Sequence, residues 1–542
     1  MNKKVLTMLV CCVAMTASAQ DAFDVLHLSQ TELRGTSRFM SMAGAFGALG
    51  GDISVMNQNP AGIGVYRSSD VGITFSLDLN SSKPVGGQKD SQTKFNVNNI
   101  GYVGAMKLNS EVMPNFNWGF SYNRVNSFHR HYRGGFDNIP TSLSNYIAGQ
   151  LNGSGITAND LVSTTTYNPY FNSPYAPWIG IVSYDIATKT NGAADIISEN
   201  NGHLQGLYGD GTTGFAEYEV DESGHTDEYS INFGGNLANV LYWGLGFGIM
   251  DLSYDSYHYY GESLDNAYIK DSDNWQKSQF MLGGADFGFV NYLNTKGTGY
   301  NFKMGVIFKP VNQLRIGLAF HTPTYYELRD SYYLVSNMAA FDGSTLLYEG
   351  EKGSNGGYYY RTDYSIKTPW RFMGSLAGVI GQKGILSLDY EYVGNETMRV
   401  GDDTRNHNEF PDVTNRVKDY FAPSHIIRVG GEFRVTPQWS LRAGYSYKTT
   451  QVKDVVDNCR TDIVTVGTDP SYQYDTNEQN ITCGFGYKYK SVYLDMAYVH
   501  KMRKSVYNAF SPVTSVSPIE PNLSTDVTDN NNRISLTLGF RF

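Results

Sequence analysis

The sequence predicts an all-β protein, and within that class a transmembrane antiparallel β-barrel. Three observations lead to this prediction: an N-terminal export signal, many short segments of alternating polarity, and a composition rich in Tyr, Phe and Gly. The 542 residues include 41 Tyr, 28 Phe and 57 Gly, and only 17% of them are charged, against about a quarter in an average soluble domain. After the signal, no apolar run approaches the roughly 18 residues of a spanning helix. The abundant aromatic residues argue against disorder.

The first 19 residues have the pattern of a secretory signal. Two lysines precede an apolar stretch at 5–15, and the small residues 17–19 form an A-x-A cleavage site. We therefore expect export across the inner membrane and a mature chain that begins at Gln20. The net charge of −10 and the lack of a basic cluster make nucleic acid an unexpected partner.

Two cysteines, Cys459 and Cys483, remain after cleavage of the signal. An exported protein meets an oxidising compartment, so the two can form a disulfide. Two unpaired thiols are the alternative, and the sequence leaves both open. The spacing of Cys and His matches no zinc or haem-attachment motif, so no metal or cofactor is expected.

Period-two alternation marks the candidate strands. In 385–392, Leu386 and Leu388 face one way while Ser387 and Asp389 face the other. About fifteen segments of roughly nine to eleven residues, the length of a tilted spanning strand, show this pattern. They are 71–79, 94–108, 116–126, 178–186, 227–235, 242–256, 301–309, 313–321, 371–380, 385–392, 426–435, 439–447, 481–489, 492–498 and 533–542.

Short and long connections alternate between these segments. The stretches 309–312 and 434–438 predict short periplasmic turns. Long extracellular loops rich in Asn, Asp, Ser, Gly and Tyr are expected at 127–177, 188–226, 257–300, 323–370, 394–424, 448–480 and 500–531. The last strand ends in Phe542, which resembles the sorting signal read by the outer-membrane barrel-assembly machinery, so we expect that machinery as a partner during biogenesis.

Residues 20–70 do not alternate and are rich in small side chains. Their glycine spacing fits neither a P-loop nor a dinucleotide-binding fingerprint. A segment of small residues ahead of a barrel is suited to close packing inside the lumen. The expected organisation is therefore a signal at 1–19, a lumen plug at 20–70 and a barrel at 71–542.

The plug region carries a family resemblance. Ser41-Met42-Ala43-Gly44-Ala45 is followed by Asp52 and by Asn59-Pro60-Ala61-Gly62, directly before the first strand at Val71. This arrangement resembles the start of the FadL/TodX-type outer-membrane transport family for long-chain fatty acids and aromatic hydrocarbons. The resemblance implies 14 strands, so one of the fifteen candidates is expected to be false; 227–235 and 481–489 are the weakest.

The resemblance also implies a function. A hydrophobic ligand is captured at the extracellular loops, passes to a pocket against the plug, and leaves sideways into the bilayer. Hydrophobic small molecules and outer-membrane lipid are then the expected partners, and no enzymatic activity is expected, because no G-x-S-x-G elbow or comparable nucleophile motif opens a helix.

Within this interpretation Asn59, Pro60 and Ala61 form the plug hairpin that faces a gap in the wall, although Asn-Pro also starts ordinary turns. Gly119, in the third strand, is a candidate for the kink that opens the wall. A Gly that only fills a gap in a regular strand is the alternative.

The stretch 140–151 predicts a short amphipathic helix inside a loop. Its apolar stripe consists of Leu143, Tyr146, Ile147 and Leu151. The stripe fits a landing face for ligand at the entry, and it fits equally a helix packed on the barrel rim.

Two other functions remain open. His129 and His131 lie two residues apart and suggest a haemin receptor, since similar N-termini occur in barrels described as such. The long Tyr-rich loops suggest an adhesin or a secretion partner, as in the shuttle barrel of type IX secretion.

Overall fold

The computed structural model describes residues 21–172, 176–184, 186, 195–270, 280–381, 383–403, 408–512 and 522–542. The expected signal and its cleavage site lie outside these residues. Among them, no helix has both the length and the apolar character needed to cross a membrane.

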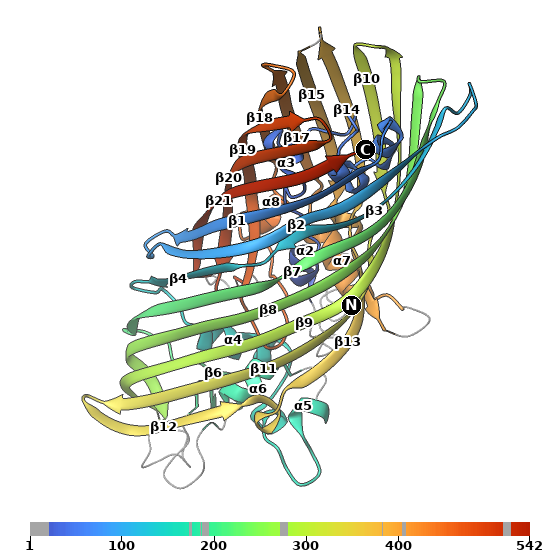
Figure 1. The fold of residues 1–542 in the computed structure, drawn as a ribbon. Coiled ribbons are helices and arrows are strands. Elements are labelled where there is room, and N and C mark those ends of the chain that lie inside the picture. Colours follow the sequence, from blue (N-terminus) through green and yellow to red (C-terminus); the bar gives the residue numbers. More distant parts are fainter. Residues whose placement is uncertain are drawn as a thin grey trace.

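Fourteen of the described strands close into one antiparallel ring (Figure 1), which confirms the predicted fold class. The ring closes where β21 pairs with β1, in an unbroken register from Asp70 opposite Arg541 to Pro84 opposite Val527. In ring order the strands are β1 (Asp70–Pro84), β2 (Asp90–Lys107), β3 (Asn115–Ser127), β7 (Thr213–Leu237), β8 (Leu241–Lys270), β9 (Phe280–Val311), β10 (Leu314–His321), β14 (Trp370–Ile380), β15 (Gly384–Gly394), β17 (Ser424–Arg434), β18 (Trp439–Lys448), β19 (Tyr472–Tyr489), β20 (Val492–Asn508) and β21 (Ser524–Arg541).

One of the fifteen candidate strands is indeed false, but it is not one of the two suspected. The segments 227–235 and 481–489 lie in β7 and β19. The false candidate is 178–186, whose first part forms helix α6 (Trp178–Ser183), and all six residues of α6 are buried. The run Trp-Ile-Gly-Ile-Val is apolar without alternation, so burial on all sides favours a core helix over a half-exposed strand.

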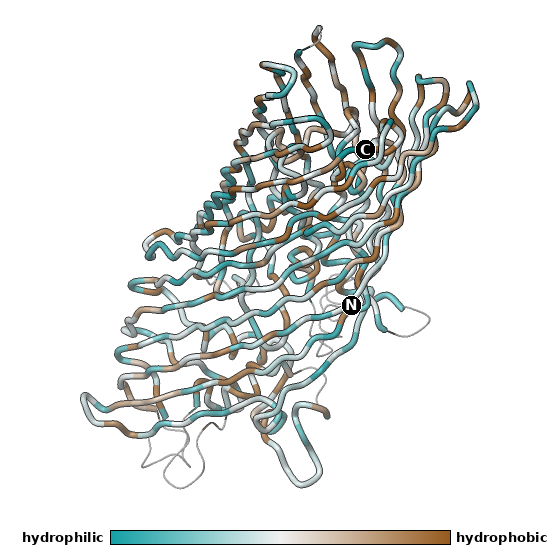
Figure 2. The backbone as a smooth tube through the Cα atoms, viewed as in Figure 1, coloured by the Kyte–Doolittle hydropathy of each residue, from teal (hydrophilic) through white to brown (hydrophobic). Residues whose placement is uncertain are grey.

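The alternation within each strand separates a lipid face from a lumen face. On β21, Ile534, Leu536 and Leu538 are exposed, whereas Ser535 and Thr537 are buried. Figure 2 shows the resulting alternation of hydrophobic and hydrophilic positions along the strands. On β8 the exposed apolar residues end near Ile249, so the residues of β8 beyond that position lie outside the membrane.

The predicted loops 257–300 and 323–370 are largely strand, which corrects the sequence-based expectation. β8 and β9 contain 30 and 32 residues and rise far beyond the membrane. Five further strands extend or flank this sheet: β4 (Arg130–Phe136), β11 (Tyr325–Asp342), β12 (Thr345–Gly353), β13 (Tyr360–Lys367) and β16 (Arg399–Asp402). The short turns at 309–312 and 434–438 join β9 to β10 and β17 to β18, as predicted.

The raised sheet is stable outside the membrane because an apolar layer covers its inner face. Leu151 and Trp178 pack with Tyr260 of β8 and Phe287 of β9 in one buried cluster. The elements of this end, in chain order, are α4 (Leu143–Gly153), η3 (Ala158–Leu161), α5 (Pro169–Asn172), α6, β5 (Ser198–Asn200), β6 (His203–Gln205), η5 (Ser354–Gly357), η6 (Asn395–Thr397), α7 (Pro411–Tyr420) and α8 (Asp454–Asp457).

The N-terminal segment 21–66 lies inside the ring (Figure 1). It consists of α2 (Ala22–Leu28), α3 (Ser37–Ser41), η1 (Ile53–Asn57) and η2 (Pro60–Val65). Such short helices need good caps. The side chains of Asp21, Thr36, Asp52 and Asn59 each accept a backbone N–H at a helix start.

Candidate functional site

Asn59, Pro60 and Ala61 are buried against the wall strands β8 and β9. The Asn59 side-chain oxygen accepts from Ala61 N at 3.1 Å, and its Nδ2 donates to Gly47 O at 2.6 Å. Pro60 occupies the first turn of η2, where its missing N–H costs nothing. The tripeptide is therefore a capped helical turn wedged between the rest of the segment and the wall.

Glycines of the wall make this close approach possible. A Cβ added to Gly244 would lie 2.2 Å from the Pro60 carbonyl, and one added to Gly317 would lie 2.4 Å from Gly47 O. Glycine removes a side chain where two backbones meet. The segment therefore sits backbone against backbone on β8 and β10.

Gly119 is another wall glycine that the N-terminal segment approaches closely, and it is not the site of a wall opening. β3 stays paired on both sides of it, with Val103 of β2 and with Asn232 of β7. A Cβ at this position would lie 2.7 Å from Met56 Sδ. The glycine makes room for the buried N-terminal segment.

Three cavities follow one another through the lumen, and helix α2 separates the first from the second. The outer cavity, of about 70 Å³, is lined by Phe23, Asp24 and His27 of α2 and by residues of β7, β8 and the stretch 466–473. The middle cavity, also about 70 Å³, is lined by Leu26 and Leu28 on the opposite side of α2. The inner cavity, about 120 Å³, lies below residues 31–34.

Two histidine–carboxylate pairs line the outer cavity. His258 Nδ1 lies 2.6 Å from Asp469, and His27 Nε2 lies 3.3 Å from Glu222. His258 belongs to the part of β8 outside the membrane. Burial lowers the pKa of His258, but the Asp469 carboxylate outweighs it, so its pKa lies above the ordinary histidine value.

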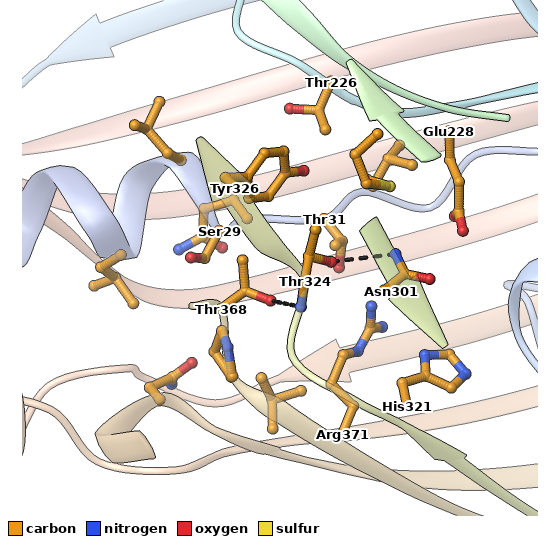
Figure 3. Close-up of a pocket in the computed structure, with 18 of the residues that line it drawn as sticks. Ser29, Thr31, Thr226, Glu228, Asn301, His321, Thr324, Tyr326, Thr368 and Arg371 are labelled. Atoms are coloured by element: carbon orange, nitrogen blue, oxygen red, sulfur yellow. Dashed lines mark hydrogen bonds between the residues drawn. The ribbon is translucent and has the colours of Figure 1, made fainter. Parts of the chain in front are cut away.

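Both apolar and polar side chains line the middle cavity, and Figure 3 labels polar ones such as Asn301, Thr324 and Thr368. Leu26, Leu28 and Met250 are among the apolar residues. Among the polar residues, Lys303 pairs with Glu228 at 2.5 Å. The backbone N of Thr324 donates to Thr368 Oγ1 at 2.8 Å, and Asn301 Nδ2 donates to Thr324 Oγ1 at 3.2 Å. The arrangement suits an amphipathic or weakly polar ligand.

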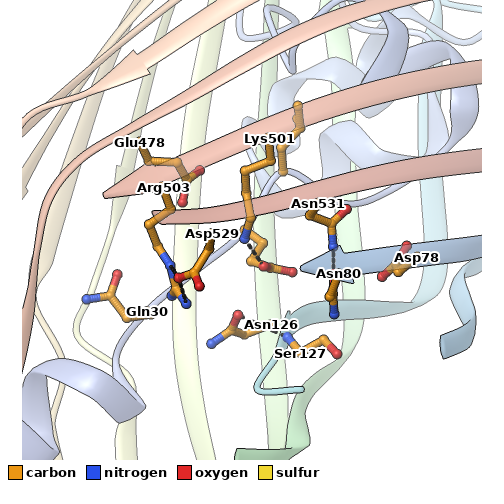
Figure 4. Close-up of polar contacts among 12 residues, drawn as sticks. Gln30, Asp78, Asn80, Asn126, Ser127, Glu478, Lys501, Arg503, Asp529 and Asn531 are labelled. Atoms are coloured by element: carbon orange, nitrogen blue, oxygen red, sulfur yellow. Dashed lines mark hydrogen bonds and ion pairs between the residues drawn. The ribbon is translucent and has the colours of Figure 1, made fainter. Parts of the chain in front are cut away.

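Ion pairs hold the stretch 29–34, which separates α2 from the deeper segment, against β1, β20 and β21. Arg34 lies 2.8 Å from Asp78, and Arg533 binds the same Asp78 at 2.8 Å. Lys501 pairs with Glu32. Figure 4 shows Lys501 beside a second pair formed by Arg503 and Asp529, 2.9 Å apart. Because these groups are paired and largely buried, they fix the position of the stretch.

The wall beside the inner cavity has an interrupted ladder. β2 and β3 pair only from Asn99 opposite Asn123 toward the short-turn end. In the described chain, residues 90–98 of β2 pair with β1 alone. Arg124 lines the inner cavity and bridges the interruption by donating to Asn96 Oδ1 at 3.0 Å. We call this interruption the β2–β3 seam.

On the outer face of the barrel, exposed apolar side chains of β1 and β2 lie beside the seam. Phe95 of β2 is 62% exposed, and Leu77 of β1, opposite it, is 41% exposed. The sequence analysis missed the seam, although one signal was present. Asn98 and Asn99 are both buried, so the doublet breaks the period of two, and the β1–β2 register shifts there.

Helix α4 forms where a helix was predicted, but its stripe is not an entry face. Leu143, Tyr146, Ile147 and Leu151 are all buried in the apolar cluster of the raised sheet. The alternative, a helix packed on the rim, describes the structure, because the raised sheet supplies an apolar surface for it.

Of the two alternatives that the sequence left open for the cysteines, the structure has the unpaired thiols, since Cys459 and Cys483 are both free. Cys483 is exposed on the same face of β19 as Ile481 and Phe485, whereas Cys459 follows α8 and is partly buried. Among the histidines considered for haem, both ring nitrogens of His131 face carboxylates, with Nε2 2.9 Å from Glu219 and Nδ1 3.6 Å from Asp90.

Comparison with known proteins identifies a family for this chain. Residues 220–542 match the family model described as outer membrane protein transport protein (OMPP1/FadL/TodX). A search of the curated proteins finds no match. The solved structure of a Pseudomonas aeruginosa FadL homologue has a TM-score of 0.51 at 13% identity, covering 94% of this chain and 99% of that one.

Two toluene transporters are also similar over 94% of this chain and 99% of theirs: TodX of Pseudomonas putida, with a TM-score of 0.45 at 10% identity, and TbuX of Ralstonia pickettii, with 0.42 at 13%. The family match covers more than half of the sequence and includes 11 of the wall strands from β7 onward. The protein therefore belongs to the OMPP1/FadL/TodX family of outer-membrane transport proteins.

Proposed function

We propose that the protein is a passive channel through which hydrophobic small molecules, such as long-chain fatty acids or aromatic hydrocarbons, cross the outer membrane. The chain reaches that membrane by Sec-type export and cleavage after Ala19. The observation that carries the proposal is the order of the three cavities. They lead from the end of the barrel with the raised sheet, past α2, to the β2–β3 seam.

In this proposal the segment 21–66 is a plug that stays in place during transport. Its backbone rests on wall glycines such as Gly244, and charged contacts such as Arg34 with Asp78 hold it. A ligand that cannot pass the plug has to leave sideways. Lateral exit also suits the cargo, because exposing an acyl chain to water costs about 0.8 kcal/mol per CH₂, so a long chain costs more than about 10 kcal/mol.

The β2–β3 seam provides this exit. It adjoins the inner cavity on one side and exposed apolar side chains on the other, so a ligand that displaces the Arg124 side chain from Asn96 moves directly into lipid. Binding and consumption downstream then drive the flow, without an energy source in the barrel.

A disulfide across the seam tests the proposal. In the variant Asn99→Cys/Asn123→Cys the two residues stand directly opposite each other at the end of the ladder. We expect oxidation to reduce uptake of labelled oleate or toluene by about tenfold and reductant to restore it. The matched control is Ala377→Cys/Ser387→Cys, a directly opposite inward-facing pair on the far wall. Equal uptake by the oxidised and the reduced seam variant would refute the lateral route.

A further inference from the structure

The short-turn end of the barrel carries a charge opposite to that of the whole chain. The sequence has 42 Lys plus Arg against 52 Asp plus Glu. At the short-turn end, the stretches 66–69, 107–114, 237–241, 309–314, 380–384, 434–439, 488–492 and 541–542 contain one acidic residue, Glu111, and eight basic ones. The basic residues are Arg67, Lys107, Lys309, Lys383, Arg434, Lys488, Lys490 and Arg541.

Four of these residues form a continuous group that we call the rim patch: Lys383, Arg434, Lys488 and Lys490. They lie on three adjacent turns, which are joined by backbone hydrogen bonds from Arg434 N to Lys383 O at 2.7 Å and from Lys488 N to Gln438 O at 2.9 Å. All four are exposed, and no described carboxylate forms an ion pair with them. Their positive charges therefore add up without local compensation.

An apolar belt borders the rim patch on the lipid side. Phe433, Trp439 and Tyr489 are 53%, 46% and 57% exposed, although they are large and apolar. Lys490 Nζ lies 5.4 Å from the centre of the Tyr489 ring. Exposed aromatic side chains mark the boundary between hydrocarbon and headgroups, and lysines next to them extend their charge to the headgroup level.

We propose that the rim patch binds the phosphate of an anionic phospholipid in the leaflet at the short-turn end, with the acyl chains lying along Phe433 and Trp439. Lys and Arg donate charge-assisted hydrogen bonds to phosphate oxygens, and basic clusters at a membrane surface attract acidic lipids. The patch and the belt adjoin each other, so the fitting ligand is anionic at one end and apolar at the other. This inference is independent of the transport route.

Native mass spectrometry of the barrel, taken from vesicles of equal parts phosphatidylglycerol and phosphatidylcholine with identical acyl chains, tests the proposal. We expect retained phosphatidylglycerol to exceed phosphatidylcholine. In the variant Lys383→Gln/Lys488→Gln/Lys490→Gln this preference should fall sharply, since each basic residue near a membrane surface is worth about 1 kcal/mol, or about fivefold.

The matched control is Lys83→Gln/Lys89→Gln/Lys94→Gln, which removes three exposed lysines from the β1–β2 hairpin at the opposite end. It should keep the preference, and both variants should keep the heat-modifiable migration of a folded barrel. If both variants lost the preference for phosphatidylglycerol equally, net charge alone would explain the preference, and the proposal would be overturned. Complete competition by millimolar inorganic phosphate would also overturn it, since the patch would then bind a free anion without its lipid.

Discussion

Arg38 of α3 and Glu432 of β17 form a two-point contact, with Nε 2.9 Å from Oε2 and Nη2 3.4 Å from Oε1. Arg442 of the neighbouring strand β18 donates to the same Oε2 at 2.6 Å. One wall carboxylate therefore holds the N-terminal segment and its own sheet together.

Replacing Arg38 by Ala removes one of the two guanidinium partners of Glu432. We expect the variant Arg38→Ala to lower the free energy of unfolding by about 2 kcal/mol, because a mostly buried carboxylate loses a charge-assisted pair. Denaturant titration of the refoldable barrel measures this change. Arg361→Ala, at an exposed position, is the control, and equal stability of the two variants would show that the contact contributes nothing.

Gly244 should not tolerate a side chain. In the variant Gly244→Ala the new Cβ meets the Pro60 backbone at 2.2 Å, and overpacking of this kind costs about 1–3 kcal/mol. We expect residues 21–66 to become accessible to protease in intact cells or vesicles. Gly378→Ala is the matched control, because nothing lies within 4 Å of its added Cβ. Unchanged protease resistance in Gly244→Ala would mean that the N-terminal segment does not pack closely against β8 at this position.

The cap of α4 should weaken as pH rises. Glu262, in the part of β8 outside the membrane, accepts from Leu143 N and from the Tyr260 hydroxyl, both at 2.7 Å. Burial raises the pKa of Glu262 to about 7. A raised carboxyl pKa means that the folded state favours the protonated form, so stability is lost as pH rises from about 4.5 to about 7.

Hydrogen exchange of α4 between pH 5 and pH 8, corrected for the intrinsic rate, measures this effect. The protection of α4 should decrease with pH in the natural chain. It should be independent of pH in the variant Glu262→Gln, whose amide oxygen still accepts both hydrogen bonds without a charge. A pH-dependent loss of the same size in Glu262→Gln would assign the effect to another group.

The two thiols should react separately. Because Cys459 and Cys483 are both free, maleimide added to the denatured, unreduced protein should label both. Prior reduction should change neither the labelling nor the thermal stability. A mass increase only after reduction would show a disulfide, and the variant Cys483→Ser would then release Cys459 for labelling.

The sequence predicted the wall well, because the pattern that forms it is local. In β21, Leu536 and Leu538 alternate with Thr537, and this alternation directly gives a strand with one apolar face and one polar face. Lipid covers the apolar face and the packed lumen covers the polar face, so the faces in the structure are those that the pattern predicts. The same reasoning failed at 178–183, where an apolar run without alternation fits a buried helix and a buried strand equally.

The sequence by itself determined the fold class and the positions of the fourteen wall strands among fifteen candidates, since those depend on periodicity, whereas the count of fourteen was implied by the family resemblance. Only the tertiary structure decided that β8 and β9 continue above the membrane, that the stripe of α4 is covered, and that the ladder stops at Asn99 and Asn123. These features depend on which surfaces meet. An apolar helix stripe has the same residue spacing whether it is covered or exposed, so the spacing does not show which it is. A seam is a property of two neighbouring strands, so the pattern within one strand does not predict it.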